Sequence, residues 1–579
     1  MLKKNDEFNL KITGYTSEGG GVGKYDGQAV FVENTAVGDE ILCHIIKAKS
    51  TYAVGKAMKI IKPSKSRIEP ECEAFKSCGG CSFAHIKYED ELKAKEQKVK
   101  DAFSRIGGLT PPFAPIIASP ETTRYRNKAQ YPVRRENGIL NIGFYAKKSH
   151  RVIDGGDCLL QPVEFTEIIE IFRKWINNNN ITVYSENTNM GLLRHIYLRK
   201  AFATGEIMVC VVINGKTLPY YENLLDELKA IDGFKTLILN INRKNTNVVL
   251  GDECISLYGD GYITDILCDV KVKISPLSFY QVNRNGAQLL YGKAAEYADI
   301  SKDDDILDLY CGTGTIGLSM ASKAKSIIGV EIIPEAIEDA KINAALNNFN
   351  NTRFICGDAS KAAETLKAEG ITPTTIILDP PRKGCVPELL KTVCEINPEK
   401  IVYVSCDPAT LARDCGRLFE LGYTVQEVTP VDMFPRTSHV ETVALLSRQI
   451  NVHKMKLNSA PFEMIKNGEK TIELRLFDEK RQKIKVGDKI VFTENTTGET
   501  LNTTVVKLHR FDSFKELYKS LPLLKCGYTT ENVDNATPSD MEQYYSVEEQ
   551  RKYGVVGIEL CRPEQITDES VVLLTKAHK

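Results

Sequence analysis

Residues 305–317 read D-I-L-D-L-Y-C-G-T-G-T-I-G, and residues 327–331 read I-I-G-V-E. The first stretch is an apolar strand that runs into a glycine-rich turn and a helix, and the second is another strand ending in an acid. Such a βαβ unit binds a nucleotide-like ligand over the turn, and a carboxylate about 20 residues further on accepts its hydroxyl groups. Because a glycine pattern of this kind also fits a dinucleotide, the neighbouring strands must decide the ligand.

The next strands also end in acidic residues. Residues 354–358 read F-I-C-G-D, and residues 375–382 read T-I-I-L-D-P-P-R. Acids at these strand ends, together with Asp308, favour S-adenosylmethionine over a dinucleotide. An acid followed by two prolines is typical of methyltransferases that act on planar nitrogen heterocycles. The prolines stiffen the loop, and Asp379 can hydrogen-bond the edge of a flat ring.

A cysteine ends the strand that comes after these. Residues 403–414 read Y-V-S-C-D-P-A-T-L-A-R-D, so Cys406 lies at the carboxyl end of an apolar strand. Pro408 prevents further ladder hydrogen bonds, and Thr410 is placed to start a helix. Ligands bind at this edge of an open α/β sheet. By itself, however, Cys406 fits a buried structural thiol equally well.

Taken together, the motifs resemble those of the TrmA/RumA family of RNA uracil-5-methyltransferases, in its iron–sulfur branch that modifies 23S ribosomal RNA. The likeness runs from residue 8 to about residue 446. The matching text comprises R-Y-R-N-K at 124–128, G-L-L-R-H at 191–195, S-F-Y-Q-V-N at 278–283, D-L-Y-C-G-T-G at 308–314, L-D-P-P-R-K-G at 378–384, S-C-D-P-A-T-L-A-R-D at 405–414 and D-M-F-P-x-T-x-H-V-E at 432–441.

The resemblance implies that Cys406 is the nucleophile and that Glu441 removes a proton. Uracil C5 is a weak nucleophile, so a thiolate adds to C6 first, and a base must later take the C5 proton. Asp407 stands where Asn is common, and Asp358 where some relatives have Asn. The resemblance assigns the S-adenosylmethionine site to Gln281, Tyr310, Thr315, Glu331, Asp358 and Asp379.

Two features precede the βαβ unit. Residues 8–61 alternate short β-like runs with glycine turns, which predicts a small OB-like barrel and resembles the TRAM module found on RNA-modifying enzymes. A C-x5-C-G-G-C motif follows, with one more cysteine far downstream. This spacing favours a four-iron cluster, with zinc and free thiols as alternatives. The expected ligands are Cys72, Cys78, Cys81 and Cys158.

The last 130 residues lie beyond this resemblance. The spacing G-x-K-x-x-E-x-R at 468–475 and the sequence Y-G-V-V-G-I at 553–558 resemble the ASCH domain, a PUA-like barrel associated with RNA. Basic side chains here and upstream are candidates for RNA contacts. They are Arg124, Arg126, Lys128, Arg194, Lys470 and Arg475.

The whole chain has 579 residues, a net charge of −1 and a mean hydropathy of −0.23. No run reaches the ~18 apolar residues of a membrane span, and the start lacks a signal-peptide core. We therefore expect a cytoplasmic, multidomain α/β protein that acts as a monomer on RNA. Its expected domains are an OB-like barrel (1–62), an iron–sulfur and central β domain (63–270), a Rossmann-like methyltransferase domain (271–448) and a PUA-like barrel (449–579). A charged helix at 88–107 is expected to dock on the methyltransferase domain.

Ribosomal RNA is the expected substrate, since the transfer-RNA branch of the resembled family generally lacks the barrel and the cluster. The alternatives are a tRNA uracil-5-methyltransferase, a cytosine-5 methyltransferase and an RNA-binding scaffold without activity. Intact Cys406, Asp379 and Glu441 argue against the scaffold.

Overall fold

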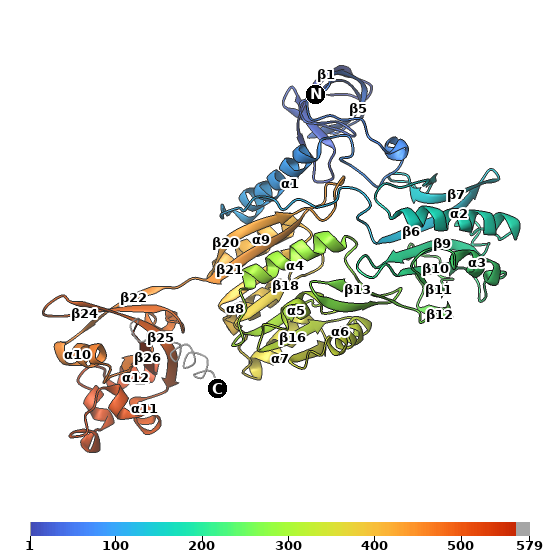
Figure 1. The fold of residues 1–579 in the computed structure, drawn as a ribbon. Helices are drawn as coiled ribbons and strands as arrows, with labels where there is room; N and C mark the ends of the chain where they lie inside the picture. Colours follow the sequence, from blue (N-terminus) through green and yellow to red (C-terminus); the bar gives the residue numbers. More distant parts are fainter. Residues whose placement is uncertain (1, 563–579) are drawn as a thin grey trace. The chain divides into compact units, whose positions relative to one another are not determined.

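The computed structural model describes residues 2–562, and the chain divides into two compact units, Met1–Arg448 and Gln449–Lys579 (Figure 1). The first unit holds a closed barrel, a seven-stranded sheet, a two-stranded hairpin and a second seven-stranded sheet, in this order along the chain. No helix among the described residues is long and apolar enough to cross a membrane.

The chain begins with a closed five-stranded barrel, as its glycine-separated runs predict. The strands pair in the order β1-β2-β3-β5-β4 around an apolar core. Gly55 shows why glycine is needed here, because a Cβ atom would lie 2.3 Å from Cys43 Sγ. The strands are β1 (Glu7–Tyr15), β2 (Gly21–Tyr25), β3 (Gln28–Val32), β4 (Glu40–Ala48) and β5 (Tyr52–Lys62).

Helix α1 (Tyr88–Ala102) follows the cysteine motif and continues as a π-helical turn, Phe103–Gly107. Gly108 ends it in the left-handed conformation (φ 64°), as expected of a helix closed by two glycines. Val99, Ala102 and Phe103 are buried in the same core as the methyltransferase sheet. The helix therefore packs on that sheet, against α9 and β20.

The central domain is built on a seven-stranded sheet in the order β12-β11-β10-β9-β6-β7-β8. Two amphipathic helices, α2 and α3, bury their apolar faces in its core. The elements are β6 (Lys128–Glu136), β7 (Ile139–Tyr145), β8 (Val152–Asp154), α2 (Val163–Asn178), β9 (Leu193–Lys200), β10 (Ile207–Ile213), α3 (Tyr221–Leu228), β11 (Phe234–Ile241) and β12 (Glu253–Tyr258). A hairpin of β13 (Ile263–Leu267) and β14 (Val270–Ile274) leads to the next domain.

The third sheet is doubly wound, with strand order β17-β16-β15-β18-β19-β21-β20. Its first five strands are parallel, and β21 runs antiparallel between β19 and β20. The strand order reverses between β15 and β18, the place where such sheets bind ligands. The strands are β15 (Asp305–Leu309), β16 (Ser326–Glu331), β17 (Thr352–Cys356), β18 (Thr375–Leu378), β19 (Lys400–Ser405), β20 (Tyr423–Val431) and β21 (Glu441–Arg448).

Helices cover both faces of this sheet, which explains why its strands are apolar on both sides. One face packs on α4 (Arg284–Ala298), α5 (Thr315–Met320) and α6 (Pro334–Leu346). The other packs on α1, α7 (Ala359–Ala368), α8 (Pro387–Ile396) and α9 (Pro408–Glu420).

The second unit has a five-stranded sheet in the order β22-β24-β25-β26-β23, with two apolar cores. Its elements are β22 (Val452–Leu457), α10 (Ser459–Asn467), β23 (Ile472–Leu476), β24 (Lys489–Glu494), β25 (Thr500–Phe511), α11 (Phe514–Ser520), α12 (Val547–Tyr553) and β26 (Val555–Cys561). Gly468 closes α10 in the left-handed conformation, as the sequence predicts.

Candidate active site

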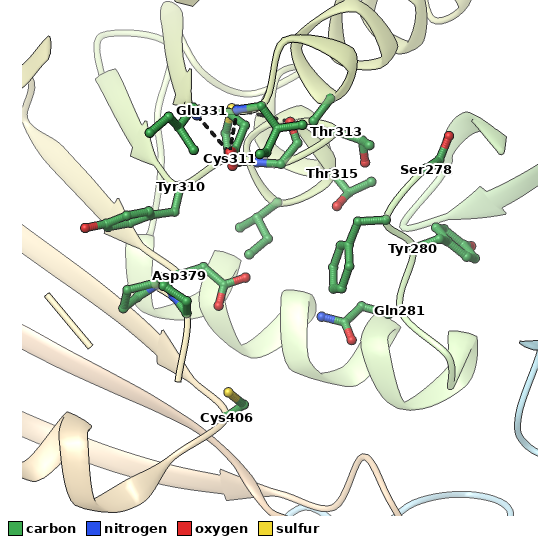
Figure 2. Close-up of a pocket in the computed structure, with 18 of the residues that line it drawn as sticks. Ser278, Tyr280, Gln281, Tyr310, Cys311, Thr313, Thr315, Glu331, Asp379 and Cys406 are labelled. Atoms are coloured by element: carbon green, nitrogen blue, oxygen red, sulfur yellow. Dashed lines mark hydrogen bonds between the residues drawn. The ribbon is translucent and has the colours of Figure 1, made fainter. Parts of the chain in front are cut away.

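A cavity of about 1010 Å³ lies at the carboxyl ends of the methyltransferase strands. Each parallel strand from β15 to β19 contributes residues from its end or from the turn that follows. Figure 2 shows Asp379, Gln281 and Cys406 around this space. The cavity is lined by all eight residues that we expected to bind the donor or carry the chemistry: Gln281, Tyr310, Thr315, Glu331, Asp358, Asp379, Cys406 and Glu441.

A hydrogen bond from a backbone amide to a buried carboxyl group fixes the glycine-rich turn. Asp308, buried under the turn, accepts the Gly317 amide through Oδ2 at 3.0 Å. A Cβ atom on Gly317 would lie 2.9 Å from that same oxygen, so glycine is required here. Tyr310 has a φ of 67°, a conformation that costs a non-glycine residue energy and often occurs at functional sites.

The acid at the end of β16 is fixed by three backbone amides. Glu331 Oε1 accepts the amides of Ile332 at 2.8 Å and Ile333 at 3.0 Å. Its Oε2 accepts the Gly312 amide at 3.2 Å. The carboxylate therefore already lies beside the glycine-rich turn, where it can accept hydroxyl groups of a nucleoside.

Cys406 and Glu441 meet because of strand register. β19 pairs antiparallel with β21 so that Ser405 lies opposite Thr442, which places the next residue, Cys406, beside Glu441. The helix after Cys406 begins at Pro408 rather than at Thr410. Asp407 caps it by accepting the Ala409 amide at 2.8 Å, and proline suits the first helical position.

Burial and like charges shape the electrostatics of this cavity. Burial, with the nearby Asp379, raises the pKa of Glu441 to about 8, and burial raises the pKa of Asp379 to about 7. Burial, then the carboxyl groups of Glu441 and Asp379, raise the pKa of the Cys406 thiol to about 11, while Arg382 opposes them. A cationic ligand would reverse much of this effect.

Several cavity residues had no assigned role before the structure. Phe279 is 61% exposed although it is large and apolar, which suits an aromatic surface for a flat base. Ser278 donates to Asp339 Oδ2 at 2.6 Å, and both line the cavity. Phe434 and His439 line it beside Glu441. Ser278, Phe279, Phe434 and His439 belong to the motifs quoted above, whereas no motif includes Asp339.

The four predicted cluster cysteines line a second cavity, of about 290 Å³. Burial, followed by the thiols of Cys158, Cys78 and Cys72, raises the pKa of the Cys81 thiol to about 12. Among residues 2–562, no group of three or more His, Cys, Asp or Glu side chains is arranged to hold a metal ion. Arg126 and Lys128 line this cavity and the larger one.

The six candidate RNA-binding cations lie in different surroundings. Burial, with Arg199 and Arg126, lowers the pKa of Lys128 to about 8. Arg124 pairs with Asp157 and donates to the Cys158 carbonyl at 3.1 Å. Arg194 is buried and donates to the carbonyls of Asn242 at 2.7 Å and Lys244 at 2.9 Å.

The two candidates in the second unit share one buried acid. Lys470 Nζ lies 2.7 Å from Glu473 Oε2, and Arg475 Nε lies 2.8 Å from Glu473 Oε1. Arg475 also donates to the Tyr545 hydroxyl at 3.2 Å. These charges therefore form a network on and around β23.

A family model described as tRNA (Uracil-5-)-methyltransferase matches residues 87–449. The chain belongs to this family of RNA methyltransferases. Models of the TRAM and ASCH domains match residues 2–58 and 455–564, so the expected likeness to these three families is confirmed. The multidomain α/β fold class is confirmed as well.

Relatives of the same family agree over the first unit. A protein of Clostridium tetani named as an RNA methyltransferase is 46% identical over 447 residues, which cover 77% of this chain and 97% of that protein. A Halalkalibacterium halodurans RNA methyltransferase is 42% identical over 77% of this chain and 98% of its own length.

A solved structure shares the fold. The Pyrococcus abyssi tRNA (uracil-54, C5)-methyltransferase in complex with S-adenosyl-L-homocysteine superimposes with a TM-score of 0.62. It is 30% identical, and the match covers 76% of this chain and 99% of that one. As a methyltransferase of this family, the protein uses S-adenosylmethionine and acts on RNA.

Proposed function

We propose that the protein methylates C5 of a uridine in RNA through a covalent adduct between Cys406 and uracil C6. The observation that carries this proposal is the shared cavity: the thiol and the Glu441 carboxyl group lie side by side at its wall, and the six expected donor residues line the rest. Nothing in donor binding alone needs a thiol there.

The proposed reaction gives both of these residues a defined role. The Cys406 thiolate adds to C6, and the electron pair of the C5–C6 double bond moves into an enolate, which makes C5 nucleophilic. S-adenosylmethionine supplies the methyl group that C5 takes. Glu441 accepts the C5 proton, the double bond forms again, and the bond between Cys406 sulfur and C6 breaks.

The donor site follows from the turn and the strand ends. We assign nucleoside hydroxyl binding to Glu331, whose carboxylate is fixed beside the glycine-rich turn. Asp358 accepts the amides of Ser360 and Lys361 as the cap of α7 and lines the same cavity. Gln281, Tyr310, Thr315 and Asp379 complete the proposed donor site.

A uracil inside folded RNA cannot reach this cavity, so the base must be flipped out or lie in a single-stranded loop. Arg126 and Lys128 at the cavity wall are suited to hold the RNA backbone near it. The barrel within residues 1–62 and the central domain within 63–270 would then bind RNA around the methyltransferase domain, residues 271–448. We propose a further RNA contact for the ASCH domain, residues 449–579, through Lys470 and Arg475.

We propose 23S ribosomal RNA as the substrate, because the chain combines the barrel with the four-cysteine motif. Transfer RNA is the second candidate, since the solved relative from Pyrococcus abyssi acts on uracil 54 of tRNA. The purified protein should be incubated with unmodified 23S fragments and tRNA transcripts, and 5-methyluridine mapped by mass spectrometry. Methylation of tRNA alone would reassign the substrate, and methylcytidine or no modified uridine would overturn the reaction itself.

We further propose that Cys72, Cys78, Cys81 and Cys158 hold a [4Fe–4S] cluster. An all-sulfur donor set around one cavity fits such a cluster. Zinc, which also accepts four thiolates, is the alternative. The reaction transfers no electron, so the cluster would be structural. Iron and sulfide should be found after anaerobic purification; zinc at one equivalent would contradict the assignment.

A further inference from the structure

The loop at residues 432–440 joins β20 to β21 and ends at the proposed base. Val431 and Glu441, its flanking residues, pair across the two strands. Phe434 and His439 from this loop line the active-site cavity. The loop therefore forms the wall next to Glu441, and whatever fixes the loop fixes that wall.

Helix α1 holds the loop through a fully buried group of charges. Lys95 Nζ donates to Glu91 Oε1 at 2.7 Å, to Asp432 Oδ1 at 2.7 Å and to the Phe434 carbonyl at 3.1 Å. The side chains of Lys95, Glu91 and Asp432 are all 0% exposed. Glu91 Oε1 also accepts the Arg436 amide at 2.8 Å. Two turns of one helix thus fix both ends of the segment 432–436.

The chain that leaves the four-cysteine cavity holds the same loop. Ser82 and Phe83, the residues after Cys81, both donate their amides to the Arg436 carbonyl at 2.9 Å. Arg436 has a φ of 69°, a conformation that side chains other than glycine rarely adopt. This strained backbone aims its carbonyl at the cysteine segment and its amide at Glu91.

Two residues of the family motifs and one lysine complete the contacts. The Tyr125 hydroxyl donates to the Pro435 carbonyl at 2.9 Å, and Asn283 donates to the Met433 carbonyl at 3.1 Å. Lys98 donates to the Ser438 carbonyl and to Ser17 of the barrel, both at 3.0 Å. The barrel, the cysteine segment, the central domain and α4 therefore all meet at one loop.

We propose that Glu91 and Lys95 are positioning residues for the RNA side of the active site. They hold the 432–440 loop against the backbone that follows the cysteine motif. When that backbone is ordered, it fixes the positions of Phe434 and His439 at the cavity wall, and this role requires no electron transfer. The donor lies among the ends of β15 to β18, on other elements, and its binding does not depend on this contact. The inference rests on the proposed uracil methylation.

The test is Glu91→Gln, which keeps the shape of the side chain and leaves Lys95 paired with Asp432. The matched control is Glu96→Gln on the same helix, where the half-buried Glu96 pairs with Lys100. RNA carrying 5-fluorouridine is the probe, because fluorine cannot leave as a proton does and the Cys406 adduct accumulates on a denaturing gel.

For Glu91→Gln we expect adduct formation to slow by about tenfold, with S-adenosylhomocysteine affinity within about twofold of wild type by calorimetry. Deuterium uptake at the Ser82 and Phe83 amides should rise. Glu96→Gln should change none of the three. Unchanged adduct formation, or an equal loss of S-adenosylhomocysteine affinity, would overturn the proposal.

Two further results distinguish a failure of the proposed function from a failure of the positioning role. If wild-type protein forms no adduct with the probe RNA, the proposed function fails, whatever the variants do. If Glu91→Gln does not fold, Lys95→Met tests the other member of the pair, since it keeps the apolar stem and removes the ammonium group that donates to Asp432 Oδ1 and to the Phe434 carbonyl. Lys95→Met should then slow adduct formation with unchanged donor affinity; equal rates would refute the positioning role.

Discussion

The Cys406 thiol shares its cavity with two buried carboxyl groups, an unfavourable setting for a thiolate. Its pKa of about 11 follows from burial and from Glu441 and Asp379. A site usually lowers the pKa of a nucleophilic thiol, whereas burial and these two carboxyl groups raise the pKa of Cys406. The positive sulfonium of the donor and the nearby Arg382 are the charges that favour the thiolate.

Replacing Cys406 by alanine should abolish methyl transfer, by about 10⁴-fold or more, because Cys311, which also lines the cavity, lies in the glycine-rich turn after β15 and not at the end of β19 beside Glu441. Donor binding should persist, since Cys406 is not among the turn and strand-end residues assigned to it. Radiolabelled methyl transfer and calorimetry measure the two effects. The control is Cys254→Ala, an exposed thiol on β12. Retained turnover in Cys406→Ala would contradict the nucleophile assignment.

The carboxyl groups of Asp379 and Glu441 should make donor binding depend on pH. Burial raises their pKa values to about 7 and about 8, so both are largely protonated below neutral pH. A sulfonium cation binds better once they ionise. We expect the affinity for S-adenosylmethionine to rise by about tenfold from pH 6 to 8.5, one pKa unit of coupling.

S-adenosylhomocysteine is the matched control, because its sulfur is uncharged and the rest of the molecule is the same. Its affinity should change much less over the same range. Calorimetry at both pH values gives the comparison, and Glu441→Gln should reduce the slope for the cationic donor. Equal slopes for the two ligands would show that these carboxyl groups do not sense the sulfonium charge.

At the scale of the elements, the conformation of the glycine-rich turn between β15 and α5 depends on one oxygen atom, Asp308 Oδ2. In Gly317→Ala the new Cβ would lie 2.9 Å from Asp308 Oδ2, the oxygen that accepts the residue's own amide. We expect a loss of about 1–3 kcal/mol in stability and at least about tenfold in donor affinity. Thermal unfolding and calorimetry measure both.

Gly292→Ala is the control for that change. Gly292 is exposed on α4, and a Cβ there would meet nothing within 4 Å. Alanine should stabilise the helix by about 0.5–1 kcal/mol and leave donor affinity unchanged. If both alanines weakened donor binding equally, the Asp308 contact would not explain the effect.

These elements also show what a sequence can predict. The strands and turns around Cys406, Asp379 and Glu331 follow from local patterns of apolar runs, glycines and prolines. The pairing of Lys95 with Asp432 does not, because it joins residues 337 positions apart. Likewise, the local sequence around Arg194 does not indicate that its guanidinium group faces buried carbonyls rather than solvent.

At the scale of the molecule, all the residues proposed to bind the donor or carry the chemistry lie in the first compact unit. Its last strand, β21, starts with Glu441 and lies between β19 and β20, and it ends at Arg448, where the unit ends. The match to the family model ends at residue 449. The remaining domain has its own apolar cores, so it is an addition to the enzyme rather than part of its fold.

A chain ending at Arg448 should therefore fold and bind the donor within about twofold of the full-length protein. Its maximal rate of methyl transfer should also stay within about threefold, with any loss confined to the KM for RNA, which the second unit would lower through its basic side chains. A chain ending at Val440 is the control: it lacks β21, so β19 and β20 lose the strand between them and no folded protein is expected. Loss of donor binding in the Arg448 truncation would mean that the ASCH domain completes the active site.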